Sequence, residues 1–240
     1  MAGTGRTALI TGGTGGLGSR LAARLSGAGY RVAINFHTDR EGAERLAKEI
    51  GGGAIAFQAD VGDPAQVEGM ARVVAGRWGG LDVLVNCAGI TKDALLVKLR
   101  SGQWDEVLRT NLTGVFNTIR AFAPMMIEAG SGHIINISSY SGVKGKKGQA
   151  AYSASKAALI GLTASAAAEL GRHNVQVNAV LPGYMPTRMG ADARAAMDRA
   201  MEESFLGRLS DPEEAASFIA ALAGMRCVTG QVYPVESRIF

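Results

Sequence analysis

Three polar residues in the middle of the chain have types and a spacing that could move a proton. Tyr152 and Lys156 are four residues apart in a segment of helical composition, so both side chains lie on one helix face, one turn apart. A neighbouring ammonium favours the phenolate and lowers a phenol pKa that is ordinarily about 10. Ser139 follows an apolar strand, from which its hydroxyl could hydrogen-bond a carbonyl. These groups could protonate a ketone oxygen as hydride reaches its carbon, although a solvated helix face can also carry such a pair.

The composition limits the class of protein. The chain has 240 residues, of which 47% are hydrophobic and 19% are charged, which is enough for a sizeable core. No apolar run approaches the ~20 residues that span a bilayer, and no signal peptide is recognised, so we expect a cytoplasmic protein without a membrane partner. The net charge of +4 is too mild to argue for nucleic acid. The few cysteines are expected to be buried thiols, and the histidines lack ligand spacing, so no metal is predicted; these residues are Cys87, Cys227, His37, His133 and His173.

A glycine-rich turn near the N-terminus has the flanks of a phosphate-binding site. The apolar strand 7–11 runs into this turn, and an amphipathic helix continues to about Ala28. Glycines allow the backbone to approach a pyrophosphate, which then lies on the helix N-terminus. We therefore expect nucleotide contacts from Gly12, Thr14, Gly15, Gly16, Leu17 and Gly18.

The end of the next strand, 31–36, should lie beside the adenosine ribose. NAD-binding folds commonly place an acidic residue there, whereas this chain has Asn35, Phe36 and His37. No carboxylate in that stretch would repel a 2′-phosphate, and Arg40 could bind one bidentately. NADP (NADPH) is therefore favoured, and NAD stays possible. Arg40 could also be a simple charge at a helix start, since Asp39 and Glu41 flank it.

Strand-like and helix-like segments alternate along the chain. The expected strands are 7–11, 31–36, 54–58, 81–86, 133–138, 175–180 and 230–235, and Asp63-Pro64 and Asp211-Pro212 are expected to begin helices. Long helices are expected over 103–129 and 152–171. The alternation predicts a single α/β domain, 1–240, with a doubly wound, parallel, Rossmann-like sheet of about seven strands.

Three irregular stretches could carry function. Asn111 and Thr113-Gly114 interrupt the helix 103–129, either as a mild irregularity or because the asparagine has a polar role. The loop 140–149 carries three lysines among glycines, either as a solvated rim or as an anion contact for a carrier protein or CoA phosphate. The stretch 184–205 follows a strand end and is expected to be a substrate lid, helical from Ala191.

These motifs in combination resemble the single-domain branch of the short-chain dehydrogenase/reductase family, over about residues 6–236. The resemblance is carried by the glycine turn, Asn86-Cys87-Ala88-Gly89, Asn111, Ser139, Tyr152, Lys156 and Pro182-Gly183. Ser138 competes with Ser139 for the serine role, and the family spacing of thirteen residues before the tyrosine selects Ser139.

The resemblance implies a role for each matching residue. Tyr152 would be the general acid in reduction, and Lys156 would lower its pKa and hold the nicotinamide ribose. Ser139 would orient the carbonyl, and Asn111 would hold a water that links Lys156 to solvent. The remaining implied cofactor contacts are Asp60, Val61, Asn86, Ala88, Gly89, Pro182, Gly183, Met185 and Thr187.

Within the family, a closer resemblance to 3-oxoacyl thioester reductases is carried by residues 89–104 with 111–116, and by the loop 147–150. The resemblance thus implies NADPH-dependent reduction of a 3-oxoacyl thioester on acyl carrier protein or CoA, as in fatty acid biosynthesis, by a homotetramer. The alternatives are another alcohol or ketone oxidoreductase, acting on a sugar, polyol, steroid or polyketide, and a cofactor-binding scaffold without turnover. One departure is the C-terminus, where Val235-Glu-Ser-Arg-Ile-Phe240 stands in place of the usual ending in Asp-Gly-Gly.

Overall fold

All seven expected strands form, and they make one parallel sheet. The structure, a computed structural model, describes residues 5–187 and 194–238. The strands lie in the order β3-β2-β1-β4-β5-β6-β7, and neighbouring strands are all parallel. Their bounds are β1 Thr7–Thr11, β2 Arg31–Phe36, β3 Ile55–Gln58, β4 Val83–Asn86, β5 Gly132–Ile137, β6 Val175–Pro182 and β7 Val232–Val235. The order reverses between β1 and β4, which is the position where doubly wound sheets bind ligands.

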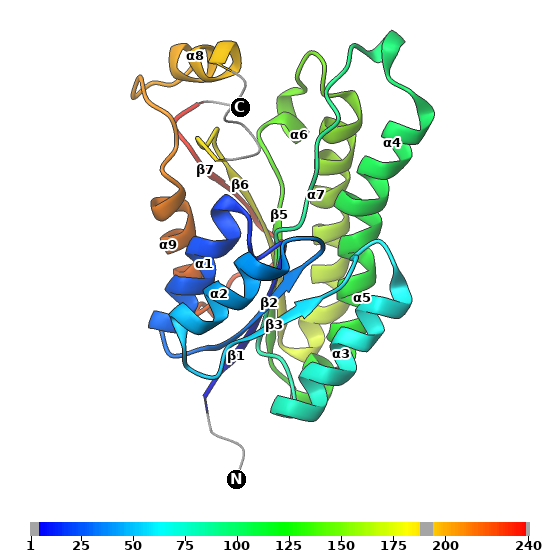
Figure 1. Cartoon of the computed structure of the whole chain (residues 1–240), viewed down its shortest axis with the longest axis vertical. Coiled ribbons are helices and arrows are strands. Elements are labelled where there is room, and N and C mark those ends of the chain that lie inside the picture. The colour runs from blue at the N-terminus through cyan, green and yellow to red at the C-terminus, as the bar shows by residue number, and fades with distance from the viewer. Residues whose placement is uncertain (1–4, 188–193, 239–240) are drawn as a thin grey trace.

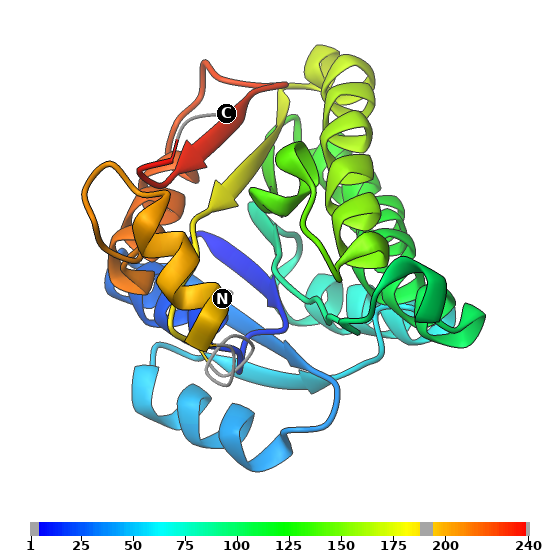
Figure 2. The same cartoon turned by 90° about the horizontal axis from the view of Figure 1, so that it is seen from above.

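Helices cover both faces of the sheet (Figures 1 and 2). One face carries α1 Gly16–Gly27, α2 Arg40–Ile50 and α9 Pro212–Leu222. The other carries α3 Pro64–Trp78, α4 Ser101–Leu108, α5 Gly114–Ala129 and α7 Ala150–Leu170. The short helices α6 Ser141–Lys144 and α8 Arg194–Glu202 lie above the carboxyl ends of the strands (Figure 1). The predicted α/β, doubly wound, Rossmann-like fold is therefore confirmed.

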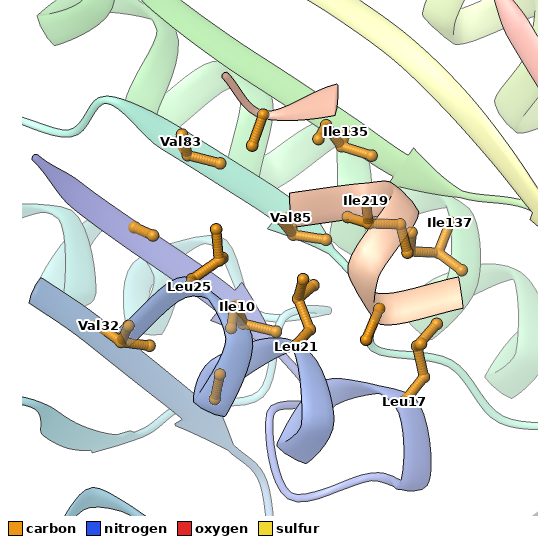
Figure 3. Close-up of a cluster of buried hydrophobic side chains, with 14 of the residues drawn as sticks. Ile10, Leu17, Leu21, Leu25, Val32, Val83, Val85, Ile135, Ile137 and Ile219 are labelled. Atoms are coloured by element: carbon orange, nitrogen blue, oxygen red, sulfur yellow. The ribbon is translucent and has the colours of Figure 1, made fainter. Parts of the chain in front are cut away.

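The sheet is buried on both faces, which explains why its central strands are continuous apolar runs rather than alternating ones. On one side Ile10 of β1, Val85 of β4 and Ile135 of β5 pack with Leu21 of α1 and Ile219 of α9 (Figure 3). A second cluster fills the space between the opposite face and helices α3, α5 and α7. Burying each large aliphatic side chain contributes about 1.5–3 kcal/mol, so the two clusters hold the strand ends in fixed positions.

Both predicted Asp-Pro helix starts are confirmed. The Asp63 carboxylate accepts hydrogen bonds from the backbone N–H groups of Ala65 (2.9 Å) and Gln66 (3.3 Å) at the start of α3. Asp211 accepts one from Glu213 (2.8 Å) at the start of α9. Such caps typically contribute about 1 kcal/mol each, and the prolines that follow need no N–H partner.

Some expectations need correction. The helix predicted over 103–129 is α4 and α5 joined by a π-helical segment, Arg109–Thr113, that contains Asn111. The loop expected over 140–149 contains the short helix α6. Cys227 is exposed and Cys87 is half-buried, so the expectation of two buried thiols is wrong. In the expected lid, 184–205, residues 188–193, including Ala191, lie outside the described residues, and α8 is observed from Arg194.

Candidate active site

The carboxyl ends of the strands enclose a cavity of about 740 Å³, within the usual size of ligand pockets. It runs from the glycine turn and the end of β2 to the start of α7. Most of the predicted cofactor contacts line it: Gly12, Thr14, Gly15, Gly16, Leu17, Gly18, Asn35, His37, Asp60, Val61, Ala88, Gly89, Tyr152, Lys156, Pro182, Gly183, Met185 and Thr187. Residues from six separate parts of the sequence thus meet at one sheet edge.

The glycine turn is packed too tightly for side chains. Gly12 has φ +61°, and a Cβ added there would lie 2.8 Å from the Ala88 Cα. At Gly18 it would lie 2.5 Å from the Gly12 carbonyl oxygen, and at Gly16 2.5 Å from the Thr187 side chain. Helix α1 begins after Gly15 with no acidic side chain in its first turn, so its N–H groups present positive charge to the cavity. The residues present therefore fit the pyrophosphate of a dinucleotide.

At the end of the cavity where adenosine is expected, Asn35 stabilises the glycine turn by hydrogen bonds. Its amide nitrogen donates to the Ala59 carbonyl (3.0 Å), and its Oδ1 lies 3.4 Å from the Gly12 nitrogen. Arg40 is not brought into the cavity lining. Its guanidinium contacts Glu44 (3.3 Å) and Gln58 (2.6 Å) outside, because it occupies the exposed first turn of α2. Asp60 lines the cavity and is paired with Arg109 at 2.8 Å, a contact that the sequence analysis missed.

Asn86 does not line the cavity either. It is buried and belongs to a polar chain through the core: Thr118 Oγ1 donates to Asn86 Oδ1 (2.7 Å), and Asn86 Nδ2 donates to Asn136 Oδ1 (2.9 Å). Asn136 in turn donates to Thr163 Oγ1 (2.9 Å). These bonds tie β4 and β5 to α5 and α7, so Asn86 holds the elements that carry the site.

Asn111 is fully buried in the π-helical segment. Its Oδ1 accepts from the Ile90 N–H (2.8 Å), and its Nδ2 donates to the Ile90 carbonyl (2.9 Å) and to Ser155 Oγ (3.1 Å). A Cβ built on Gly89 would lie 3.4 Å from Asn111 Oδ1 and 3.6 Å from Lys156 Nζ, so both polar atoms border the same point. π-Helical segments are frequent at functional sites, and this one places an amide beside Lys156.

Replacing Asn111 by alanine should destabilise the protein by about 2–3 kcal/mol, because both backbone groups of Ile90 and the Ser155 hydroxyl lose partners in a buried site. Urea denaturation of the variant beside the wild type measures this. Gln231→Ala, which removes an exposed amide bonded only to the Thr229 carbonyl, is the control and should change stability much less. An Asn111→Ala variant as stable as the control would contradict this account of the π-helical segment.

Tyr152, Ser139 and Lys156 come together where β5 ends and α7 begins. Burial raises the pKa of Tyr152, and a hydrogen bond with Ser139 partly opposes this. Lys156 is buried, which lowers its pKa to about 8, and its Nζ donates to the Ile137 carbonyl at 2.7 Å. Nζ lies 5.7 Å from the centre of the Tyr152 ring. The ammonium is directed to the end of β5 in this structure, and the lowering of the Tyr152 pKa by Lys156 stays a prediction.

The two serines have different surroundings. The Ser138 hydroxyl is buried and donates to the Lys156 carbonyl at 2.7 Å, which anchors α7 to β5. Ser139 is half-buried and accepts from the Ser141 N–H at 3.2 Å. Ser139 can therefore hydrogen-bond a ligand, while the Ser138 hydroxyl is already engaged in the fold.

A second cavity, of about 840 Å³, adjoins the first and shares these lining residues with it: Thr91, Ser139, Tyr152, Pro182, Gly183, Met185 and Thr187. It extends between the loop after Ser139, helix α8 and the C-terminal segment. Sequence reasoning missed Tyr140, Asp93, Arg199 and Arg238 in its wall. Each lies in a stretch that the sequence analysis singled out, namely 89–104, 140–149, 184–205 and the unusual C-terminus, but no local pattern identified the individual residue.

Among the described residues, no group of three or more His, Cys, Asp or Glu side chains is placed to hold a metal ion. In the same part of the chain, no helix is both long and apolar enough to cross a membrane.

Comparison with known proteins assigns the family. The short chain dehydrogenase family model matches residues 6–198. The chain therefore belongs to the short-chain dehydrogenase/reductase family; it is an oxidoreductase of ketones or alcohols, and this family binds NAD(P).

Particular relatives cover nearly the whole chain. It is 40% identical to the 3-oxoacyl-(acyl-carrier-protein) reductase FabG of Staphylococcus aureus, over 98% of each chain. It is 38% identical to the corresponding reductase of Synechocystis, over 97% of this chain and 96% of that one. Among solved structures, an actinorhodin polyketide ketoreductase variant with NADPH matches with a TM-score of 0.93 and 35% identity, over 99% of this chain and 98% of that one.

Proposed function

We propose that this protein reduces the 3-oxo group of an acyl thioester to a 3-hydroxy group with NADPH, the thioester being carried by acyl carrier protein or CoA. The observation that carries the proposal is that Tyr152 and Ser139 line both cavities, so they stand where a nucleotide in one meets a ketone in the other. The relatives are reductases of 3-oxoacyl groups on carrier protein, and the structural neighbour was solved with NADPH.

The chain supplies a cradle for the dinucleotide. The glycine turn and the N-terminus of α1 would hold its pyrophosphate, Asp60 and Val61 would flank its adenine, and Lys156 would hold the nicotinamide ribose. When bound, the cofactor supplies the hydride that goes to the carbonyl carbon.

The protein's own part in the reaction is to orient the carbonyl and to deliver a proton. The phenol of Tyr152 is protonated at neutral pH, and because burial raises its pKa, proton donation needs a neighbour that stabilises the phenolate. Ser139, hydrogen-bonded to Tyr152, would orient the carbonyl oxygen toward the phenol. Lys156 would stabilise the phenolate left behind, and a water between Asn111 Oδ1 and Lys156 Nζ would return the proton from solvent.

A turnover assay tests the substrate class. With NADPH, acetoacetyl-CoA should be reduced faster than simple ketones, sugars or steroids. Absence of turnover above background, beside rapid turnover of a small alcohol or ketone, would instead favour an oxidoreductase of that compound on the same scaffold. Binding of NADPH without turnover of any compound in the panel would favour a non-catalytic scaffold.

For the preference between NADPH and NADH, we predict that Arg40→Ala raises the KM for NADPH about tenfold and leaves the KM for NADH nearly unchanged. The present contacts of Arg40 with Glu44 and Gln58 are exposed and weak, so the guanidinium can exchange them for a 2′-phosphate. A charge-assisted hydrogen bond of that kind contributes about 1.5–3 kcal/mol, which is a tenfold effect or more. Equal changes in both KM values would show that Arg40 does not bind the 2′-phosphate.

The assembly and location stay predictions. We propose a homotetramer in the cytoplasm, with no nucleic acid or membrane partner. Exposed apolar side chains on and just before the α4–α5 helices support self-association, because Val97 is 91% and Phe116 48% exposed. Analytical ultracentrifugation of the full chain measures the assembly.

A further inference from the structure

The substrate cavity has a cationic wall that the proposed reaction does not use. Six cationic side chains line it against two carboxylates, those of Asp93 and Glu203; the cations are Lys144, Lys146, Lys147, Arg194, Arg199 and Arg238. They come from the loop after Ser139, from helix α8 and from the C-terminal segment, three parts that are distant in sequence. An acyl chain that is apolar throughout would gain nothing from such a wall, because burying it there would desolvate the cations.

The side chain of Arg238, one of these cations, is only 11% exposed. Its guanidinium lies 3.9 Å from the centre of the Tyr140 ring, and Tyr140 directly follows Ser139. Its Nε is 2.5 Å from a carboxylate oxygen of Glu236, and its Nη1 is 3.4 Å from Glu203. These contacts fix a planar donor group in the cavity wall.

Lys146 and Arg199 lie near Arg238. Burial lowers the pKa of the half-buried Lys146, and the positive charges of Arg199 and Arg238 lower it further, while Asp93 and Glu203 oppose them. The Asp93 carboxylate is bound by Gln149 Nε2 at 3.0 and 3.3 Å. Among the residues that the structure describes, no carboxylate lies within ion-pair distance of Lys146 or Arg199. Arg238 is already paired with Glu236 and Glu203, so an anion placed beside it would relieve the repulsion between the two cations that have no such partner in the described part of the chain, Lys146 and Arg199.

We propose that Lys146, Arg199 and Arg238 form an anion subsite in the substrate cavity, and that the preferred substrate is a 3-oxoacyl thioester whose acyl chain ends in a carboxylate. The subsite rests on the proposed function, since the thioester class is taken from it. The burial of Arg238 favours the free end of the acyl chain over the carrier arm, because that arm must leave the cavity toward solvent. Lys144, Lys147 and Arg199 are all exposed, but the charge of Arg199 acts on Lys146, which places Arg199 in the subsite and leaves the two lysines for a carrier phosphate.

The test compares N-acetylcysteamine thioesters, which carry no phosphate. One is the six-carbon 3-oxo acyl thioester that ends in a carboxylate, and the other is its methyl ester. The enzymes are the full-length wild type, Lys146→Gln and Arg199→Gln, with Arg208→Gln as the control, an exposed arginine outside the cavity lining. Neither cavity variant leaves a paired carboxylate behind, whereas Arg238→Gln would strand Glu236, so Arg238→Gln is a secondary variant checked first for folding.

We expect the kcat/KM of the wild type to be about tenfold or more higher for the carboxylate than for the methyl ester, because a charge-assisted hydrogen bond typically has an effect of that size. In Lys146→Gln and Arg199→Gln, kcat/KM should fall for the carboxylate substrate and stay nearly unchanged for the methyl ester, so that most of the preference is lost. Arg208→Gln should keep the preference. Equal rates on both thioesters in the wild type would overturn the subsite while leaving the proposed function intact.

A second comparison tests whether the cations bind the phosphate of the carrier instead of an acyl carboxylate. It sets acetoacetyl-CoA against the acetoacetyl N-acetylcysteamine thioester, which has no phosphate. If the two cavity variants lose rate only on the CoA thioester, the cations bind carrier phosphate and the acyl carboxylate assignment is overturned. If the wild type reduces no thioester in either comparison, the proposed function itself fails.

Discussion

Tyr152→Phe should lower kcat for ketone reduction by about a thousandfold, within the 10²–10⁴ range of a general acid, while NADPH still binds. The substitution removes only the hydroxyl that would protonate the carbonyl oxygen. Tyr152 and Ser139 line both cavities, and no other phenol in the described residues lines the nucleotide cavity. The ring that lines both cavities is kept, so the loss should appear in the chemical step.

Steady-state reduction of acetoacetyl-CoA and fluorescence titration with NADPH measure the two halves of this prediction. Tyr233→Phe, on β7 and outside the lining of both cavities, is the matched control and should keep its activity. A Tyr152→Phe enzyme that keeps more than a tenth of the wild-type kcat would assign proton donation to another group. Loss of NADPH binding together with activity would make Tyr152 a binding residue rather than the acid.

Lys156→Met should lower kcat/KM by about a hundredfold or more, which is the typical effect of removing a preorganised charge from an active site. The same variant should be more stable than the wild type at pH 7. The wild-type ammonium is held charged in a buried site that lowers its pKa from 10.5 to about 8. That difference corresponds to a burial penalty on the order of 3 kcal/mol, and losing the hydrogen bond to the Ile137 carbonyl returns about 1 kcal/mol.

The stability difference should depend on pH. Below pH 8 the lysine is protonated in both the folded and the unfolded chain, so the wild type bears the full penalty. Between about pH 8 and 10.5 only the unfolded chain keeps the proton, so the wild type gains stability as pH rises and the gap to Lys156→Met narrows. Urea denaturation of both proteins at pH 7 and pH 10 measures the gap. A variant that is less stable at pH 7, or a gap that does not change, would show that Lys156 is not held as a penalised cation.

The fold was predictable because the strands are short, continuous apolar runs separated by helices with strong boundary signals. Asp63-Pro64 and Asp211-Pro212 are local signals, and both cap helices as expected. Tyr152, Lys156 and the glycine turn were recognisable for a related reason, since each motif is read from neighbours within a few residues. The carboxyl edge of a parallel sheet then brings these local motifs together.

The parts that sequence did not predict depend on contacts between distant segments. Arg40 was assigned to the cavity by its position after β2, but its side chain pairs with Glu44 and Gln58 on the exposed side of α2. Asn86 was assigned to the cofactor, whereas it joins the buried chain from Thr118 to Thr163. The stacking of Arg238 on Tyr140 could not be predicted, because no sequence pattern near either residue indicates it.

The direction of the Lys156 side chain was also beyond local reasoning. Helix periodicity places it on the Tyr152 face, but its ammonium donates to the carbonyl of Ile137 at the end of β5, at 2.7 Å. The π-helical segment at Asn111 is a similar case, because Ile90 and Ser155, which hold its side chain, come from two other parts of the chain.

The central claim is that hydride and proton both reach one carbonyl where the two cavities meet. Transfer of deuterium tests it most directly. NADPH deuterated at the transferred position of its nicotinamide is incubated with the enzyme and acetoacetyl-CoA, and the product is analysed by mass spectrometry. We predict a 3-hydroxybutanoyl thioester with one deuterium bound to carbon 3 and none exchanged from solvent at that carbon. Oxidation of the deuterated NADPH without deuterium at carbon 3, or no product from any 3-oxoacyl thioester, would contradict the account.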